Sequence, residues 1–184
     1  MNLSEYHQQQ AAETFGKMLD KVKEKDAELE AVLKAVPVSI NGLAHVAVLG
    51  CGDKRYIPYH QLLFEDHLGT EVDMTTFDIT IEHLAGVPGV VQHDCTQPLP
   101  GGPYDLTFAH VLLKFISVDK QLAVLKNSYN ALRSGGIAIH IIDTKEIEAD
   151  KVPVSILKEQ LAQEKIEVSE VPVKYGIALV LRKA

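Results

Sequence analysis

Glycine, acidic or histidine residues directly follow four short apolar runs of this sequence: Gly50-Cys51-Gly52-Asp53, Asp78, Asp94-Cys95 and His110. Two glycines one residue apart let a backbone turn tightly and approach a ligand with no Cβ in the way. A carboxylate such as that of Asp78 can accept hydrogen bonds from both hydroxyls of a ribose. An imidazole such as that of His110 can take up a proton near neutral pH. These residue types could bind a nucleoside and move a proton.

The apolar runs alternate with helical patterns, which is the order of βα units. The expected strands are 45–49, 71–77, 87–93, 104–109 and 137–142. The expected helices are one that opens at Pro58, a short one over 79–84, and two over 118–132 and 153–163. In an open, doubly wound sheet, ligands lie beyond the carboxyl ends of the strands. We therefore expect the four positions to lie close together.

Both ends of the chain differ from this alternation. Residues 4–35 are predicted to be helical, and two strands over 166–173 and 177–181 are joined by a connection too short for a crossover. The fold class is therefore α/β: a doubly wound, mostly parallel seven-stranded sheet with an antiparallel C-terminal hairpin strand, plus N-terminal helices. Residues 1–40 are either a structural cover or a lid in which Tyr6 closes over a ligand. The mixed charges of Glu24 to Glu30 favour a solvated face.

Several segments resemble the class I S-adenosylmethionine (SAM)-dependent methyltransferases, over roughly residues 44–182. They are His45 to Gly52, Thr76 to Ile79, His93 to Cys95, Tyr104 to Leu106, Phe108 to Leu112 and Leu132 to Gly136. The resemblance implies a Rossmann-like methyltransferase domain over 41–184 with SAM as its cofactor. It also implies a cofactor site formed by Gly50, Cys51, Gly52, Asp53, Asp78, Ile79, Asp94, Cys95 and His110. Within that site, Asp78 would bind the ribose, Ile79 would pack on the adenine, and Asp94 would meet its amino group.

The sequence departs from that family at two positions. Val48 stands where members often carry an acid, and Lys54 stands where many have a third glycine. Lys54 or Arg55 could pair with the methionine carboxylate. The leading interpretation is an enzyme that methylates a small molecule. The alternatives are a catalytically weak or inactive binding or scaffold protein of the same fold, and a dehydrogenase-type nucleotide-binding protein, which the terminal hairpin disfavours.

His110 is the candidate catalytic residue, as a general base for an acceptor that must lose a proton. The other interpretation is that His110 bonds to backbone or that its main chain lines the cofactor. No required metal is expected, because the carboxylates of metal-dependent relatives are replaced by His110 at that strand end. Cys51 and Cys95 follow strands that are not neighbours, so we expect two small pocket-lining residues rather than a disulfide.

The composition excludes several function classes. The formal net charge of −7 argues against an extended nucleic-acid partner, and no apolar run is long enough to span a membrane. The N-terminus lacks the pattern of a secretory signal, which favours the cytoplasm. Acceptor contacts are expected from the N-terminal helices, the loop after 104–109 and the region 143–150. The acceptor and the oligomeric state stay open.

Overall fold

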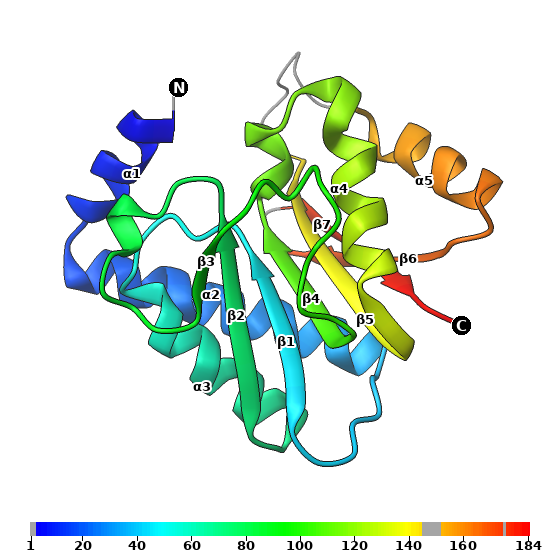
Figure 1. Cartoon of the computed structure of the whole chain (residues 1–184), viewed down its shortest axis with the longest axis horizontal. Helices are drawn as coiled ribbons and strands as arrows, with labels where there is room; N and C mark the ends of the chain where they lie inside the picture. The colour runs from blue at the N-terminus through cyan, green and yellow to red at the C-terminus, as the bar shows by residue number, and fades with distance from the viewer. Residues whose placement is uncertain (1–2, 145–151, 175) are drawn as a thin grey trace.

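The computed structural model describes residues 3–144, 152–174 and 176–184. One seven-stranded sheet runs through the molecule in the order β3-β2-β1-β4-β5-β7-β6 (Figure 1). Its strands are β1 Ala44–Leu49, β2 Val72–Asp78, β3 Val90–Gln92, β4 Tyr104–His110, β5 Leu132–Asp143, β6 Glu167–Val173 and β7 Gly176–Arg182. The first five pair in parallel, and β7 is antiparallel to both β5 and β6. The expected fold class is confirmed.

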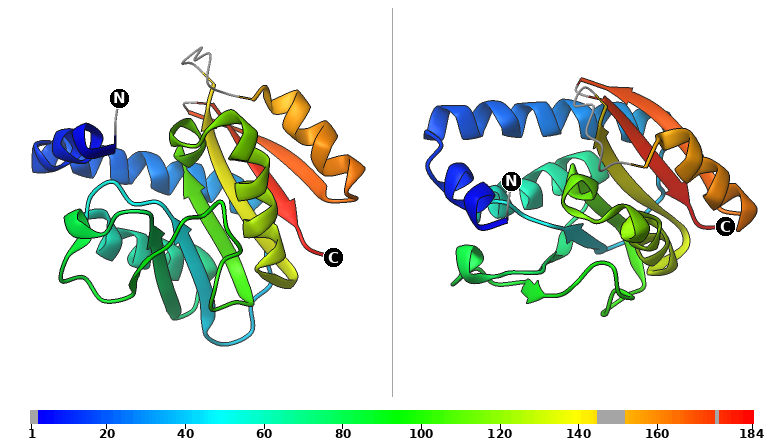
Figure 2. Two further views of the ribbon diagram at one scale, coloured as in Figure 1. Left: turned by 45° about the horizontal axis from the view of Figure 1, so that its top comes forward. Right: turned by 90° about the horizontal axis from the view of Figure 1, so that it is seen from above.

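Helices cover both faces of the sheet (Figure 2). They are α1 Leu3–Ala11, α2 Phe15–Ala35, α3 Tyr56–Leu68, α4 Val118–Asn130 and α5 Val154–Gln163, with short 3₁₀ turns η1 Glu82–Leu84 and η2 Leu112–Phe115. On one face, Leu29 of α2 and Phe64 of α3 pack on Val46 and Phe108 of the sheet. Because β1 is buried on both faces, its sequence is a nearly continuous apolar run.

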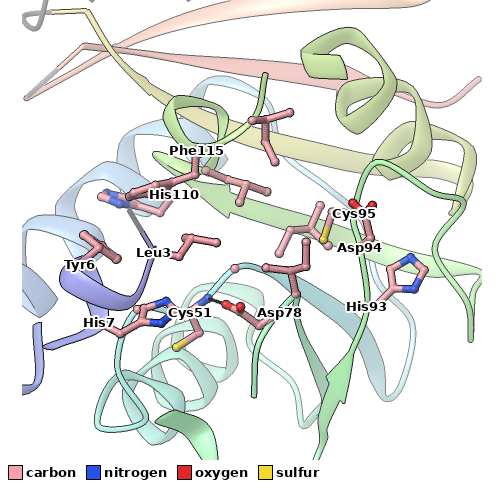
Figure 3. A pocket seen from close by; sticks show the side chains of 16 residues that line it. Leu3, Tyr6, His7, Cys51, Asp78, His93, Asp94, Cys95, His110 and Phe115 are labelled. Atoms are coloured by element: carbon pink, nitrogen blue, oxygen red, sulfur yellow. Dashed lines mark hydrogen bonds between the residues drawn. The ribbon is translucent and has the colours of Figure 1, made fainter. Parts of the chain in front are cut away.

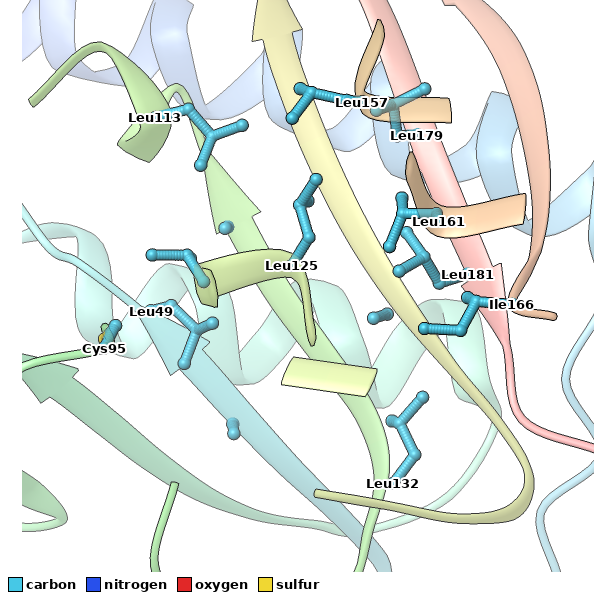
Figure 4. Packing of buried hydrophobic residues seen from close by; sticks show 14 of the residues in the cluster. Leu49, Cys95, Leu113, Leu125, Leu132, Leu157, Leu161, Ile166, Leu179 and Leu181 are labelled. Atoms are coloured by element: carbon cyan, nitrogen blue, oxygen red, sulfur yellow. The ribbon is translucent and has the colours of Figure 1, made fainter. Parts of the chain in front are cut away.

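The second face is closed by α4 and α5. Leu125 of α4 and Leu157 and Leu161 of α5 are buried against Leu179 of β7 in a continuous leucine-rich cluster (Figure 4). Burying one such side chain contributes about 1.5–3 kcal/mol relative to leaving it exposed. The two apolar layers therefore hold the parallel strands in place and fix the positions of their carboxyl ends.

The segment expected to be helical over 4–35 is divided into the two helices α1 and α2. The chain leaves α1 after Ala11, and Thr14 starts α2 as its N-cap, with its side chain accepting a hydrogen bond from the Lys17 N–H at 3.4 Å. A threonine in this position satisfies one of the free N–H groups of a new helix. The break allows α1 to leave the line of α2 and to turn back toward the sheet edge.

Other expected boundaries also shift. The helix expected over 79–84 is only the turn η1, the third strand is limited to β3, and β5 begins at Leu132. Ser134-Gly135-Gly136, which separated the expected helix over 118–132 from the expected strand over 137–142, thus lies inside β5, where the register with β4 shifts between Tyr104 and Leu106. None of these changes moves the carboxyl ends of β1, β2 or β4.

Candidate active site

A cavity of about 100 Å³ lies beyond the carboxyl ends of β1, β2 and β4, and we call it the strand-end cavity (Figure 3). Nearly all of the predicted cofactor-binding positions line it: Gly50, Cys51, Gly52, Asp78, Ile79, Asp94, Cys95 and His110. Asp53 is the exception. The structure therefore brings together residues from four separate segments, as the positions after the strands predicted.

The turn after β1 presents its backbone to this cavity. Gly50 has a φ of +79°, a conformation that residues with a Cβ rarely adopt, and its N–H donates to the Phe77 carbonyl at 2.7 Å. At Gly52, an added Cβ would lie 2.8 Å from Cε1 of Tyr6. The first glycine is thus required by the turn, and the second by the close approach of α1.

The two acidic groups of the strand-end cavity are held by backbone donors. The buried carboxylate of Asp78, 6% exposed, accepts from the Cys51 N–H at 2.8 Å and from the Thr80 N–H at 3.1 Å. A carboxylate offers about four lone-pair sites, so two remain for a ligand. Asp94 accepts from the Thr96 N–H at 2.9 Å, and this hydrogen bonding lowers the pKa of Asp94. Asp94 is therefore an ionised acceptor at neutral pH.

Asp53 serves the loop instead of the cavity. Its carboxylate accepts hydrogen bonds from the Arg55 N–H and side chain at 2.8 Å and forms an ion pair with Arg55 at 2.5 Å. The Arg55 guanidinium also donates to the Gln10 carbonyl at 2.8 Å and to the Glu13 carbonyl at 3.0 Å. Arg55 thus ties the loop after β1 to the end of α1 and is already engaged.

Helix α1 supplies three side chains to the lining of the strand-end cavity, and the sequence predicted one of them. Tyr6 was singled out by the sequence, but Leu3 and His7 were not. The Tyr6 ring packs 4.7 Å from that of Phe115, and the His7 imidazole stacks on His83 at 3.6 Å. Burial raises the pKa of Tyr6 to about 12, so its phenol stays protonated. Because α1 has no buried side chain of its own, no strong apolar pattern marked its inner face.

A second cavity of about 340 Å³ lies between α2 and the carboxyl ends of β1 and β4. We call it the α2 cavity. It shares Tyr6, the turn 50–52 and His110 with the strand-end cavity, so the two cavities meet at these residues. Its other wall comes from α2, including Lys25 and Glu28.

His110 meets a carboxylate from α2. Its Nε2 is hydrogen-bonded to Oε2 of Glu28 at 2.9 Å, and Glu28 is only 3% exposed. Burial lowers the pKa of His110 well below its ordinary value, and the nearby Lys25 charge adds to this. Burial also raises the pKa of Glu28. Both shifts favour the uncharged forms, so the His110 imidazole is neutral at pH 7.

The solvated face expected for Glu24 to Glu30 is therefore wrong at Glu28. The reason is that α2 packs along the sheet, which buries Glu28 together with Leu29 and Val32 and brings its carboxylate to His110. The sequence carried a signal for the neighbouring Lys25, not for Glu28. Lys25 continues the three- and four-residue spacing of Met18, Val22, Leu29 and Val32, so the apolar stripe contains a charged position.

The residue after His110 turns the chain sharply. Val111 has a φ of +58°, which is strained for a β-branched side chain, and its N–H donates to the Ile141 carbonyl at 2.9 Å. This bend ends β4 at His110 and starts η2, so Leu112 and Phe115 can enter the strand-end cavity. Backbone strain of this kind costs about 1–3 kcal/mol and is often found at ligand sites.

Cys51 and Cys95 are both free and buried, as small lining residues. Burial raises the pKa of Cys51 to about 11 and that of Cys95 to about 12, so neither thiol ionises at neutral pH. Thiols of this kind are poor nucleophiles.

One group in the described part of the chain has ligand atoms close enough to hold a metal ion. It consists of His7, Asp78 and His83, whose atoms lie within 4.8 Å of one another. Both Asp78 oxygens already accept backbone hydrogen bonds, and His83 Nε2 donates to the Cys51 carbonyl at 2.6 Å. The group therefore joins α1 to the carboxyl ends of β1 and β2. That no metal is required stays a prediction.

The expected contacts from the region 143–150 are only partly described. Asp143 lines the α2 cavity, whereas residues 145–151 lie outside the described part of the chain. Across the described residues, no helix is both long and apolar enough to cross a membrane.

Comparison with known proteins identifies the family. Residues 47–140, just over half of the chain, match the model of the methyltransferase domain family. No curated protein matches the chain. The solved DhpI–SAH complex covers 99% of this chain and 95% of its own, with 19% identity and a TM-score of 0.66.

Two further solved structures share the fold. The sugar N-methyltransferase KedS8 from Streptoalloteichus has 10% identity and a TM-score of 0.64, with 94% of each chain covered. The O-methyltransferase NcsB1 from neocarzinostatin biosynthesis, in complex with SAM and 2-hydroxy-5-methyl naphthoic acid, has 17% identity and a TM-score of 0.56, and 86% of this chain covers 56% of NcsB1. Together, the family match, the sheet order and the residues at the strand ends show that this chain belongs to the class I SAM-dependent methyltransferases.

Proposed function

We propose that this protein transfers a methyl group from SAM to a small-molecule acceptor, with the adenosyl part of SAM in the strand-end cavity. The observation that carries the proposal is the convergence of Gly50, Gly52, Asp78 and Asp94 on one cavity. The free lone pairs of Asp78 suit the ribose hydroxyls, and Asp94 suits the adenine amino group. Ile79 and Cys95 supply apolar surface for the adenine ring.

SAM supplies an electrophilic methyl group, so the protein mainly has to orient the acceptor, exclude water and remove a proton where the acceptor carries one. We assign proton removal to His110, because its neutral imidazole lies where the two cavities meet. The Glu28 carboxylate holds the ring by Nε2 and stabilises the imidazolium when it forms.

Residues 1–40 take two roles in this proposal. Helix α2 is a structural cover, since Leu29 and Val32 belong to the core. Helix α1 is the lid, because Tyr6 and His7 close the strand-end cavity. Ligand pockets usually measure roughly 300–1,000 Å³, so α1 has to move before a cavity of about 100 Å³ admits SAM. Residues 41–184 then form the cofactor-binding domain.

Calorimetric titration with SAM, S-adenosylhomocysteine (SAH) and NAD tests this proposal. Binding of SAM and SAH but not NAD is expected, followed by SAH formation when an acceptor panel is supplied. If neither adenosyl ligand binds, the proposal is wrong. If both adenosyl ligands bind but no acceptor of the panel is methylated, the result supports the alternative interpretation, an inactive binding protein. The departures from the family pattern at Val48 and Lys54 are the reason for that alternative.

The same proposal covers partners and location. The known activities of neighbours differ, with an N-methyltransferase and an O-methyltransferase among them, and both act on small molecules by their descriptions. A small acceptor fits the acidic net charge of −7, which disfavours extended nucleic acid. A cytoplasmic location fits two free, buried cysteines.

A further inference from the structure

The α2 cavity contains buried polar atoms that have no hydrogen-bond partner among the described residues. They are Oε1 of Glu28, Oη of Tyr56 and both ring nitrogens of His60. His60 is 5% exposed and Glu28 is 3% exposed. A buried polar group left unpaired costs about 1–3 kcal/mol, and native proteins contain few of them. Several on one cavity wall indicate that the cavity takes a polar ligand.

The α2 cavity also holds a cation without a carboxylate partner. The Lys25 Nζ lies 5.5 Å from the centre of the Tyr56 ring, and within the described residues it forms no ion pair. By contrast, Lys21 is paired with Glu13 at 2.6 Å and Glu24 with Lys174 at 2.8 Å. Burial lowers the pKa of Lys25 to about 8. An anionic ligand would offset this effect of burial on the pKa, because it would give the Lys25 ammonium group a charged partner.

Aromatic rings form one side of the α2 cavity. Tyr56 and His60 are stacked at 6.1 Å, His60 meets Phe108 edge-on at 6.2 Å, and Phe108 lies 6.3 Å from His110. Flat apolar molecules pack well on such rings. The volume of about 340 Å³ is at the small end of ligand pockets. A compact acceptor with one or two rings is therefore the best fit.

We propose that the α2 cavity binds the methyl acceptor, and that this acceptor is a small phenol-type compound held as its oxyanion by Lys25. The proposal rests on the methyltransferase function proposed above. In the reaction, the hydroxyl proton passes to His110. The oxygen then bonds to the methyl carbon, and the electron pair of the broken C–S bond stays on sulfur, so no oxidant or reductant is needed. An amine would gain nothing from Lys25, because a cation repels the positive charge that a methylated amine develops.

The test uses 4-nitrophenol, which turns yellow only when it ionises, and needs no turnover. The full chain is titrated into 4-nitrophenol buffered where the free phenol is mostly protonated. We expect binding with a rise in phenolate absorbance, and at least tenfold weaker binding of 4-nitroanisole and 4-nitroaniline. Lys25→Met should weaken phenol binding about tenfold and abolish the colour change, because a charge-assisted contact is lost. Lys25→Arg should retain most of the phenol affinity and most of the colour change.

The matched control is Lys23→Met, on the exposed side of the same helix, which should bind as the parent does. Circular dichroism verifies that each variant is folded. Equal binding of phenol, anisole and aniline would overturn the proposal, as would phenol bound only in its protonated form.

A parallel calorimetric arm separates the acceptor from the cofactor carboxylate. SAH and 5′-methylthioadenosine, which lacks the amino-acid part, are titrated into the parent and into Lys25→Met. For each ligand, we expect the affinity of Lys25→Met to equal that of the parent. If Lys25→Met weakens SAH alone and SAH displaces the phenol, Lys25 holds the cofactor carboxylate and the acceptor proposal is wrong. If neither ligand binds the parent, the proposed function itself fails, whatever the phenol does.

Discussion

The strand-end cavity and the α2 cavity meet at the same turn, 50–52, but they are built in different ways. In the strand-end cavity, Asp78 and Asp94 are held by backbone N–H groups. In the α2 cavity, Glu28 and His60 keep buried atoms unpaired. The difference teaches that the fold itself positions the acidic groups of the strand-end cavity, whereas the α2 cavity has buried polar atoms that only a ligand can pair. A fixed wall suits a cofactor that is always the same, and an incomplete wall selects an acceptor.

The largest effect should come from the residue at the junction of the two cavities. His110→Gln should lower kcat about 10²–10⁴-fold while SAH affinity stays within about twofold, because only proton removal is lost. The measurement is the initial rate of SAH formation with the best acceptor of the panel. A kcat that stays near the parent value would show that the main chain of His110, and not its imidazole, serves the site.

Asp78→Ala should damage the strand-end cavity alone. We expect SAH affinity to fall about a hundredfold, since two hydrogen bonds from the ribose to a carboxylate are lost. Calorimetry with SAH measures this, and phenol binding in the α2 cavity should change little. Asp73→Ala, at the other end of β2 and exposed, is the control. An unchanged SAH affinity for Asp78→Ala would refute the ribose assignment.

Glu28→Gln should damage the α2 side of the junction alone. The imidazolium of His110 loses its counter-ion, so kcat should fall about tenfold and the acidic limb of the pH–rate profile should move to lower pH. A purely structural loss would lower the rate without moving the profile. Glu30→Gln, on the exposed side of α2, should leave the rate and profile as they are.

Acid should destabilise the core through the buried side chain of His140. Burial lowers the pKa of His140 to about 3 in the folded protein, against 6.5 for the ordinary group. The unfolded chain therefore binds the extra proton first, so stability is full above pH 6.5 and falls as the pH drops from 6.5 toward 3. The slope for one such histidine is about 1.4 kcal/mol per pH unit. Urea unfolding at several pH values should show a shallower loss in His140→Gln than in the parent. Identical slopes would contradict the assignment.

The smallest effect is expected at Gly52. In Gly52→Ala, the new Cβ pushes the Tyr6 ring aside. The free energy of unfolding should change by less than about 1 kcal/mol, since the clash displaces α1 rather than the core. Limited proteolysis should cut α1 faster than in the parent. Gly16→Ala, where a Cβ meets nothing within 4 Å, should leave the cleavage rate unchanged.

The sequence predicted the strand-end cavity better than the α2 cavity for a physical reason. Gly50, Asp78 and Asp94 follow apolar runs, and parallel strands bring such positions to one edge whatever lies between them. Glu28 contacts His110 across 82 residues, which no local pattern reveals. The sequence also did not predict that Leu3 and His7 of α1 line the strand-end cavity, because the break near Thr14 changes the direction of the chain. Asp53 does not line the strand-end cavity because it pairs locally with Arg55, and the sequence did not show that this pair would form.

Arg55 has a consequence for the rate of turnover. Its guanidinium holds the end of α1 through two carbonyl oxygens, while no side chain of α1 is fully buried. Opening α1 therefore breaks a few polar contacts and exposes little apolar surface, so it costs far less than global unfolding. We expect the amides of α1 to exchange with deuterium well before those of β1 and β4. If α1 is the lid of the proposed function, we expect the departure of SAH to require this local opening, and the Arg55 contacts to set how often it occurs.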